Sequence, residues 1–413
     1  MGASPNLAQS TKGRSPRNRG LQGARMNGGD LSHARDQVVS PAARQQGSSR
    51  MFASRITTPP SAIPRVEDTF ASTPSCRSTD DVQNSHGTPG SHVIYHSRRF
   101  GDLQLRIPRH PDAEEGRKLF AHHLWNAGVI CADALEEASQ DDETRPFHAS
   151  NSNPGLGHPA SAWDKRYWDV RARTVLEVGA GTALPSIVAA LSGAASTTIT
   201  DHPASPALTT NAIQQNVKIN VLERDRRRRG TDDHTSSSSS SSSSSLLPSP
   251  DVTISGYTWG TPTFYSPSSY GKRSPRQPRA FDRMIVADCL WMPSQHVNLV
   301  KTIVRYLDES RPGSCALVVA GFHTGREIVG HFFEVATGQS APPSSLEDGN
   351  GFEETKSGAT KDPDLEEVRC PLRLAEIFEI DVNGLRRPWE PVRLGEAQDA
   401  AKRWCVVAVL VKK

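Results

Sequence analysis

Glycine and carboxylate residues stand where two neighbouring apolar stretches end. The first stretch, TVLEV at Thr174–Val178, runs into Gly179, Ala180 and Gly181 and then directly into an apolar helical pattern. Small residues let a ligand approach the backbone there, and the N–H groups at the start of the helix add a positive bias. Asp201 ends the next apolar stretch, STTITD. A carboxylate at that point can accept hydrogen bonds from both ribose hydroxyls, so the spacing predicts a nucleoside-binding site.

Another carboxylate follows a further apolar stretch, RMIVA. Asp288 begins the run Asp-Cys-Leu-Trp, which ends at Trp291. Open α/β sheets bind ligands beyond the carboxyl ends of their strands, so Asp288 is a candidate to orient a reacting amine and Trp291 to line its channel. The alternative is that Asp288 only caps a helix or lies in a loop. His323 is a weaker candidate for the same pocket.

The elements that must position these residues alternate between strand and helix. Strands are expected at 174–179, 196–201, 252–257, 281–287 and 314–321, and helices at 183–193, 206–220, 294–308 and 325–337. Strands separated by helices imply a parallel sheet with crossover helices on both faces. Two further strands, near 374–380 and at 404–411, predict a closing antiparallel hairpin.

Order is expected to begin near His92, with a short hairpin in VIYHSRRFGDLQLRI. A helix over 114–139 should follow, because apolar residues recur at helical spacing. Its buried face is predicted to carry Phe120, Leu124, Ala127, Cys131 and Leu135.

Residues 1–90 read as a disordered tail, because they are rich in Ser, Pro, Gly and Arg and poor in large apolar residues. The domain therefore spans 91–413. Low-complexity insertions are expected at about 221–250, which holds the serine tract Ser236–Ser245, and at 261–280 and 339–370. Each insertion falls between elements, where loop length adds little entropy.

Charge and composition exclude several classes of protein. Residues 1–90 carry a net charge of +5 against +3 for the whole chain, so residues 91–413 sum to −2, which argues against a nucleic-acid-binding face. No run of apolar residues is long enough to cross a membrane. The six cysteines form no CxxC pair, which indicates buried thiols in a reducing compartment. We expect a cytoplasmic monomer without a metal cofactor.

The glycine turn departs from the dinucleotide fingerprint GxGxxG or GxGxxA, because its sixth position is Leu184. Glu177, two residues before the first glycine, together with Asp201 and the closing hairpin, fits S-adenosylmethionine better. Three further segments, LFAHHLWNAG, YTWG and VADCLW, complete the pattern. From residue 93 onward the chain resembles the seven-stranded, S-adenosylmethionine-dependent methyltransferases, and within them lysine methyltransferase family 16 and its fungal nicotinamide N-methyltransferase-like branch.

The resemblance implies a Rossmann-like class I methyltransferase sheet that binds S-adenosylmethionine as methyl donor. The residues that it assigns to the donor, with Glu177 added, are Trp125, Glu177, Gly179, Ala180, Gly181, Asp201, Trp259 and Ala287. An indole such as Trp259 can cover the face of adenine, and aromatic rings attract a sulfonium by about 0.5–2 kcal/mol. The alternative is that Trp125 and Trp259 are core residues. Relatives show Asp-x-x-Tyr where this chain has Asp288 to Trp291, so a role that needs the tyrosine hydroxyl is in doubt.

The acceptor must present a nitrogen lone pair. With a pKa near 10.4, a lysine is neutral about once per thousand at pH 7.4, whereas an N-terminal amine with a pKa of about 7.8 is far more often neutral. We expect methylation of a protein N-terminal amine, a lysine or both; by resemblance the protein is translation elongation factor 1-alpha. The alternatives are a small-molecule N-methyltransferase of the nicotinamide type and a non-catalytic binding protein.

Overall fold

The structure is a computed structural model. It describes residues 55–59, 84–110, 121–141, 163–232, 249–265, 280–339 and 372–413. The chain divides into two units, residues 1–44 and 45–413, and every described residue belongs to the second. Ser236–Ser245 and most of the insertions expected at 261–280 and 339–370 lie outside the described residues.

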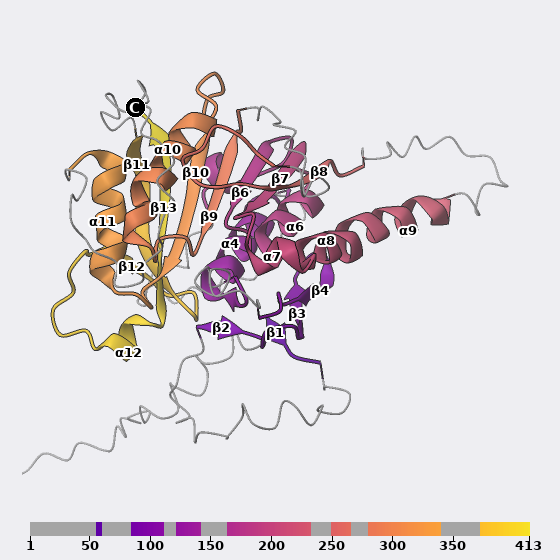
Figure 1. Ribbon diagram of the computed structural model, residues 1–413, viewed down its shortest axis with the longest axis horizontal. Helices are drawn as coiled ribbons and strands as arrows, with labels where there is room; N and C mark the ends of the chain where they lie inside the picture. Colours follow the sequence, from indigo (N-terminus) through magenta and orange to yellow (C-terminus); the bar gives the residue numbers. More distant parts are fainter. Residues whose placement is uncertain are drawn as a thin grey trace, which may run out of the picture. The chain divides into compact units, whose positions relative to one another are not determined.

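Eight strands form one sheet in the order β12-β11-β13-β10-β9-β6-β7-β8 (Figure 1). Five of them are parallel: β6 (Thr174–Val178), β7 (Ser196–Asp201), β8 (Val252–Gly256), β9 (Arg283–Ala287) and β10 (Cys315–Gly321). The antiparallel strand β13 (Trp404–Lys412) lies between β10 and β11 (Leu372–Asp381). The predicted seven-stranded sheet with its closing hairpin is confirmed. A short eighth strand, β12 (Arg386–Pro388), was not expected from the sequence.

Alternate residues of the central strands enter two hydrophobic cores, one on each face of the sheet. Ile285 and Val319 face one core, whereas their neighbours Val286 and Val318 face the other. A fully buried side chain of this size contributes roughly 1.5–3 kcal/mol.

Helices cover both faces (Figure 1): α4 (Asn126–Ala138), α6 (Leu184–Leu191) and α8 (Ala212–Val217) on one, and α10 (His296–Tyr306) and α11 (Arg326–Thr337) on the other. The remaining short helices of the described residues are α5 (Lys165–Trp168), α7 (Pro206–Thr209), the 3-10 turn Pro293–Gln295 and α12 (Gln398–Ala401). Among the described helices, none is long and apolar enough to cross a membrane.

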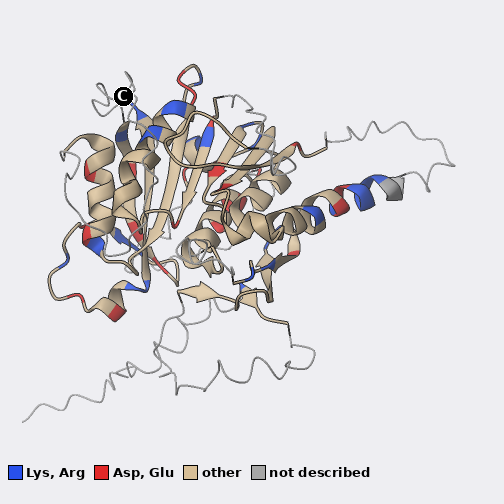
Figure 2. Cartoon of the chain, in the orientation of Figure 1, with Lys and Arg blue, Asp and Glu red and all other residues tan. Residues whose placement is uncertain are grey.

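The helix predicted at 206–220 is longer and more irregular than expected. After α7 and α8 the chain forms a π-helical turn, Lys218–Leu222, and continues as α9 (Glu223–Asp232). The insertion predicted to begin at 221 therefore begins as helix, because its Glu and Arg residues favour helical backbone. Figure 2 shows that basic and acidic residues are spread along α9. Arg224 ties the start of α9 to the body by donating to the carbonyl of Phe100 at 2.6 Å.

The predicted N-terminal hairpin is present as β3 (His92–Ser97) and β4 (Gly101–Arg106). Side chains from α8 and the π-helical turn form hydrogen bonds with the backbone groups on the outer edge of β4. Asn216 accepts from the backbone N–H of Arg106 at 2.7 Å, and Asn220 accepts from the N–H of Gln104 at 3.0 Å. Both amides also donate to the carbonyl oxygens of the same two strand residues. Asparagines at i and i+4 thus take the place of a neighbouring strand.

Two short strands come from the stretch that was expected to be a disordered tail. Strand β1 (Ile56–Thr57) pairs with β3, and β2 (Ser85–His86) pairs with β5 (Leu124–Trp125). Within the described part of the helix predicted over 114–139, helix α4 begins at Asn126, because the backbone of Leu124 and Trp125 pairs with β2 instead; residues 114–120 lie outside the described residues. Phe120, predicted on the buried face of that helix, lies outside the described residues.

Replacing Asn216 by alanine should test the contribution of the β4 edge to stability. Its fully buried amide also donates to the carbonyl of Thr182 at 3.0 Å, so its loss leaves three backbone groups without this partner. We expect Asn216→Ala to lower the free energy of unfolding by about 1–3 kcal/mol in urea titrations. The control Lys218→Ala, at an exposed position two residues on, should change it by less than about 0.5 kcal/mol. Equal effects of the two substitutions would contradict this account.

Candidate active site

A cavity of about 840 Å³ lies at the carboxyl ends of the parallel strands. The ten residues that the sequence assigned to binding or catalysis all line it, whereas the weaker candidate His323 is not among the lining residues. The ten are Trp125, Glu177, Gly179, Ala180, Gly181, Asp201, Trp259, Ala287, Asp288 and Trp291. The structure therefore brings them together, while the role of each stays a prediction.

The glycine turn needs glycine at Gly179 for two reasons. Its φ of +65° lies in the left-handed region, and a Cβ atom there would stand 2.7 Å from Cys289 Sγ and 3.3 Å from Cζ2 of Trp259. Gly181 also has a positive φ, +53°, but a Cβ there would meet nothing closer than 3.9 Å. Gly181 is thus required for conformation, whereas Gly179 is required for conformation and for space.

Asp201 ends β7 and directs its carboxylate at the glycine turn. One oxygen accepts from the backbone N–H of Gly181 at 2.8 Å and the other accepts from the N–H of His202 at 2.7 Å. Burial raises the pKa of this carboxyl group, and hydrogen bonds from the Gly181 N–H, the Ser205 side chain and the His202 N–H act against the increase. A carboxylate has about four acceptor positions, so these contacts leave capacity for a ligand hydroxyl in the cavity.

Glu177 lies beneath the turn as a buried carboxyl group. Its Oε2 accepts from the backbone N–H of Ser186, in the first turn of α6, at 3.2 Å. Burial raises its pKa to about 8; the Ser186 N–H opposes this increase and the nearby Asp201 adds to it. Glu177 therefore lines the cavity, as predicted, and also satisfies an N–H group at the start of α6.

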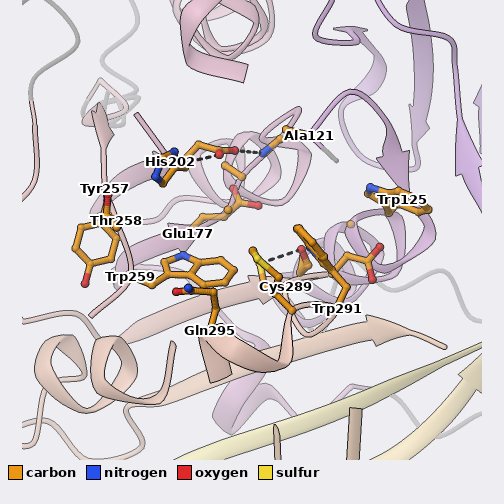
Figure 3. A pocket seen from close by; sticks show the side chains of 18 of the residues that line it. Ala121, Trp125, Glu177, His202, Tyr257, Thr258, Trp259, Cys289, Trp291 and Gln295 are labelled. Atoms are coloured by element: carbon orange, nitrogen blue, oxygen red, sulfur yellow. Dashed lines mark hydrogen bonds between the residues drawn. The ribbon is translucent and has the colours of Figure 1, made fainter. Parts of the chain in front are cut away.

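Three tryptophans from different parts of the chain form the aromatic lining of the cavity. Trp259 follows β8, Trp291 follows β9 and Trp125 ends β5. Figure 3 shows Trp259 beside Thr258 on one side of the cavity, and Trp125 and Trp291 toward the other. The cavity therefore has a wall next to the glycine turn and a separate aromatic wall beyond it.

Asp288 stands just past β9 in a strained backbone conformation. Its φ is +58°, a region that aspartate enters more readily than most residues. Its N–H donates to the carbonyl of Val319 at 2.8 Å, and its Oδ1 accepts from the N–H of Gly321 at 3.1 Å. Burial raises the pKa of its carboxyl group. These contacts explain the conformation without a helix cap, and they leave Asp288 on the cavity wall.

The sequence interpretation missed several residues of the wall. His202 directly follows Asp201 and Cys289 follows Asp288, so adjacency to a predicted residue was an available signal. Gln295 and Asn298 come from the 3-10 turn and α10, and no motif marks them. Among the described residues, no group of His, Cys, Asp and Glu is arranged to hold a metal ion.

Comparisons with known proteins agree with this geometry. A sequence model of the lysine methyltransferase family matches residues 110–227. The protein N-terminal and lysine N-methyltransferase EFM7 of Neurospora crassa is 28% identical over 260 residues, which is 59% of this chain and 72% of the relative. The EFM7 proteins of Gibberella zeae and Aspergillus fumigatus are 28% and 32% identical. These matches cover 53% and 49% of this chain and 65% and 56% of the relatives.

Solved structures give a weaker similarity. An S-adenosylmethionine-dependent methyltransferase from Streptococcus mutans is 10% identical, with a TM-score of 0.36 over 79% of this chain and 57% of the other. Strand order, and not this similarity, therefore assigns the fold.

The raised pKa of Glu177 gives the protein a pH-dependent stability. Between pH 4.5 and about 8 the folded protein keeps a proton that the unfolded chain releases, so the free energy of unfolding falls as pH rises through this window. Glu177→Gln keeps an acceptor for the Ser186 N–H and removes the titration. In urea titrations without ligand, the variant should equal wild type near pH 4.5 and be more stable at pH 8. The gain is roughly 1.4 kcal/mol per pKa unit. A difference that is constant with pH would contradict the raised pKa.

Three independent lines now agree on the class of protein. The strand order with its closing antiparallel strands is that of a class I methyltransferase. The cavity combines the glycine turn and Asp201, which suit S-adenosylmethionine, and the family match covers the same segment of chain. The chain is therefore an S-adenosylmethionine-dependent methyltransferase that is similar to the lysine methyltransferase family over residues 110–227.

Proposed function

We propose that this enzyme methylates a protein at an N-terminal amine, a lysine or both. The observation that carries the proposal is one cavity that is lined by the glycine turn and Asp201 and also by Trp125, Trp291 and Asp288. The names of the relatives point to the same two kinds of acceptor. The family resemblance adds translation elongation factor 1-alpha as the acceptor protein.

The donor fits the wall next to the glycine turn. Gly179 leaves a space that a Cβ would fill, Asp201 has free acceptor positions for a ribose, and Trp259 offers an aromatic face. When bound, S-adenosylmethionine supplies an electrophilic methyl group on a positively charged sulfur. The residues of this wall hold and orient the donor, and positioning of this kind can lower a barrier by up to roughly 7–11 kcal/mol.

The acceptor amine belongs at the other wall. A carboxylate at Asp288 attracts and orients the incoming ammonium, and the rings of Trp125 and Trp291 tolerate the cationic product by cation–π attraction. Trp291 has no hydroxyl group, so at this position the chain offers an aromatic surface and no hydroxyl that could donate a proton. The amine must lose a proton before it can react.

Location and assembly are part of the same proposal. The described cysteines, Cys131, Cys289, Cys315 and Cys405, are all buried free thiols, which suits a reducing compartment such as the cytoplasm. We propose a monomer, which light scattering after size-exclusion chromatography would test.

Labelled S-adenosylmethionine and a cell extract lacking this activity would test the function. Purified protein should transfer label to one protein band, and mass spectrometry should locate the methyl groups at its N-terminus, at a lysine or at both. Asp288→Asn serves as the control, since it keeps the size of the side chain and removes the charge; we expect about 100-fold less label. Label only in the small-molecule fraction would favour a nicotinamide-type acceptor. Absence of any label would favour a non-catalytic protein.

Asp201→Ala should weaken donor binding. The substitution removes the ribose acceptor and leaves the N–H groups of Gly181 and His202 without their partner. Hydrogen bonds to charged groups contribute about 1.5–3 kcal/mol each, so the Kd for S-adenosylhomocysteine should rise about tenfold or more in calorimetry. Thermal melting of the ligand-free variant separates this loss from unfolding. An affinity equal to wild type would exclude the ribose contact.

A further inference from the structure

His323 lies behind the wall assigned to the acceptor, just past β10. Its ring stacks on Trp125, with centroids 4.8 Å apart and an interplanar angle of 16°. Its Nδ1 is 3.9 Å from Oδ1 of Asp288. The two residues that it contacts both line the cavity, and so does its chain neighbour Thr324. His323 is therefore in contact with the two side chains that receive the amine.

The backbone around His323 is shaped to keep the imidazole there. A Cβ at Gly321 would lie 3.1 Å from His323 Nδ1, so glycine makes room for the ring. The ring of Phe322, the residue between Gly321 and His323, stacks on Trp389. The guanidinium of Arg326 lies over the same Phe322 ring at 4.0 Å. Arg326 is fixed in turn by a bidentate ion pair with Glu379, at 2.6 and 2.8 Å. The segment that carries His323 is thus held at both ends.

The carboxyl group of Asp288 is enclosed, whereas the imidazole reaches solvent. The side chain of Asp288 is 7% exposed and that of His323 is 21% exposed. The other titratable groups near this pair are His123, on the edge of Trp125, and the buried thiols of Cys289 and Cys405. Burial and the Asp288 charge raise the pKa of both thiols, so each keeps its own proton. The positive charge of Arg326 is compensated by Glu379 and Glu396. His323 is therefore the group through which a proton on the Asp288 carboxyl group can reach solvent.

We propose that His323 is a positioning and proton-relay residue for the acceptor amine. The proposal rests on the proposed function. The incoming ammonium gives one proton to the Asp288 carboxylate, Asp288 passes it to the imidazole of His323, and the exposed edge of the ring releases it to water. The neutral amine then carries the lone pair that would form the new N–C bond, while the methyl–sulfur bond of the bound donor would break and leave its electron pair on the sulfur of S-adenosylhomocysteine. Hydrogen bonds at catalytic groups are often long in a ligand-free protein and shorten in the complex, and one water molecule can also bridge 3.9 Å.

This relay predicts a difference between two kinds of acceptor. At pH 7.5 about a third of N-terminal amines with a pKa near 7.8 are already neutral, whereas a lysine with a pKa near 10.4 is neutral about once per thousand. Loss of the relay should therefore slow lysine methylation far more than N-terminal methylation. A residue with a purely structural role would slow both acceptors equally at every pH.

The test uses the full-length chain and two peptides from the protein that is labelled in the extract. One has a free N-terminus and no lysine, and the other has an acetylated N-terminus and a single lysine. His323→Phe keeps a ring for Trp125 and cannot titrate. In single-turnover assays at pH 7.5 we expect it to slow the lysine peptide about tenfold or more and the N-terminal peptide less than about threefold. The difference should shrink as the pH is raised toward 9.5.

Three controls separate the relay from loss of structure. His323→Ala with added imidazole should recover part of the lysine rate, since free imidazole can occupy the space. Calorimetry with S-adenosylhomocysteine should give an unchanged Kd for both variants. His96→Gln disrupts a matched but exposed pair, His96 Nδ1 to Asp102 Oδ1 at 2.7 Å on the N-terminal hairpin, and should change neither rate.

Equal losses on both peptides, no loss on the lysine peptide, or no recovery with imidazole would overturn the role of His323 while the proposed function stands. A wild-type protein that methylates neither peptide would overturn the proposed function, and this proposal with it. The two failures are thus distinguished by the wild-type rates alone.

Discussion

The carboxylate of Asp201 bridges two backbone N–H groups, and the geometry of the cavity follows from this arrangement. Its contact with Gly181 holds the glycine turn against the end of β7, so that two neighbouring strands present one surface. Because Gly179 has no Cβ atom, Cys289 and Trp259 can approach the glycine turn closely. This approach brings the loops after β8 and β9 together. A buried negative charge is costly unless it is hydrogen-bonded, so the same contacts that build the site also make the charge tolerable.

A second buried carboxyl group, Glu177, shares this region of low dielectric. Because the pKa of Glu177 is raised, the negative charge beneath the glycine turn is reduced. Glu177 accepts from the Ser186 N–H, and Asp201 keeps its own two N–H donors. Asp288 also lines the cavity, and burial raises the pKa of its carboxyl group. The protein thus places three carboxyl groups around one cavity, and their different hydrogen-bond partners decide which chemistry each can perform.

Local sequence patterns predicted the parts of the fold that depend on neighbouring residues. The glycine turn, Asp201 and the alternation of strands and helices are of this kind, and all ten predicted site residues line the cavity. The parts that were missed depend on pairing between distant segments. Nothing near Ile56 or Ser85 in sequence indicates that they pair with Tyr95 and Trp125. The same holds for Asn216, which replaces a strand beside Arg106, and for the stacking of His323 on Trp125.

The pairing of β2 with β5 connects the N-terminal region to the wall assigned to the acceptor. Ser85 pairs with Trp125, the N–H of Asn126 donates to the carbonyl of Asn84 at 3.0 Å, and the His86 ring hydrogen-bonds the Asn126 side chain at 2.7 Å. A segment that composition alone would discard is therefore part of the active-site architecture. Proteolysis between this segment and the hairpin would remove the support of one aromatic wall while the sheet stayed whole.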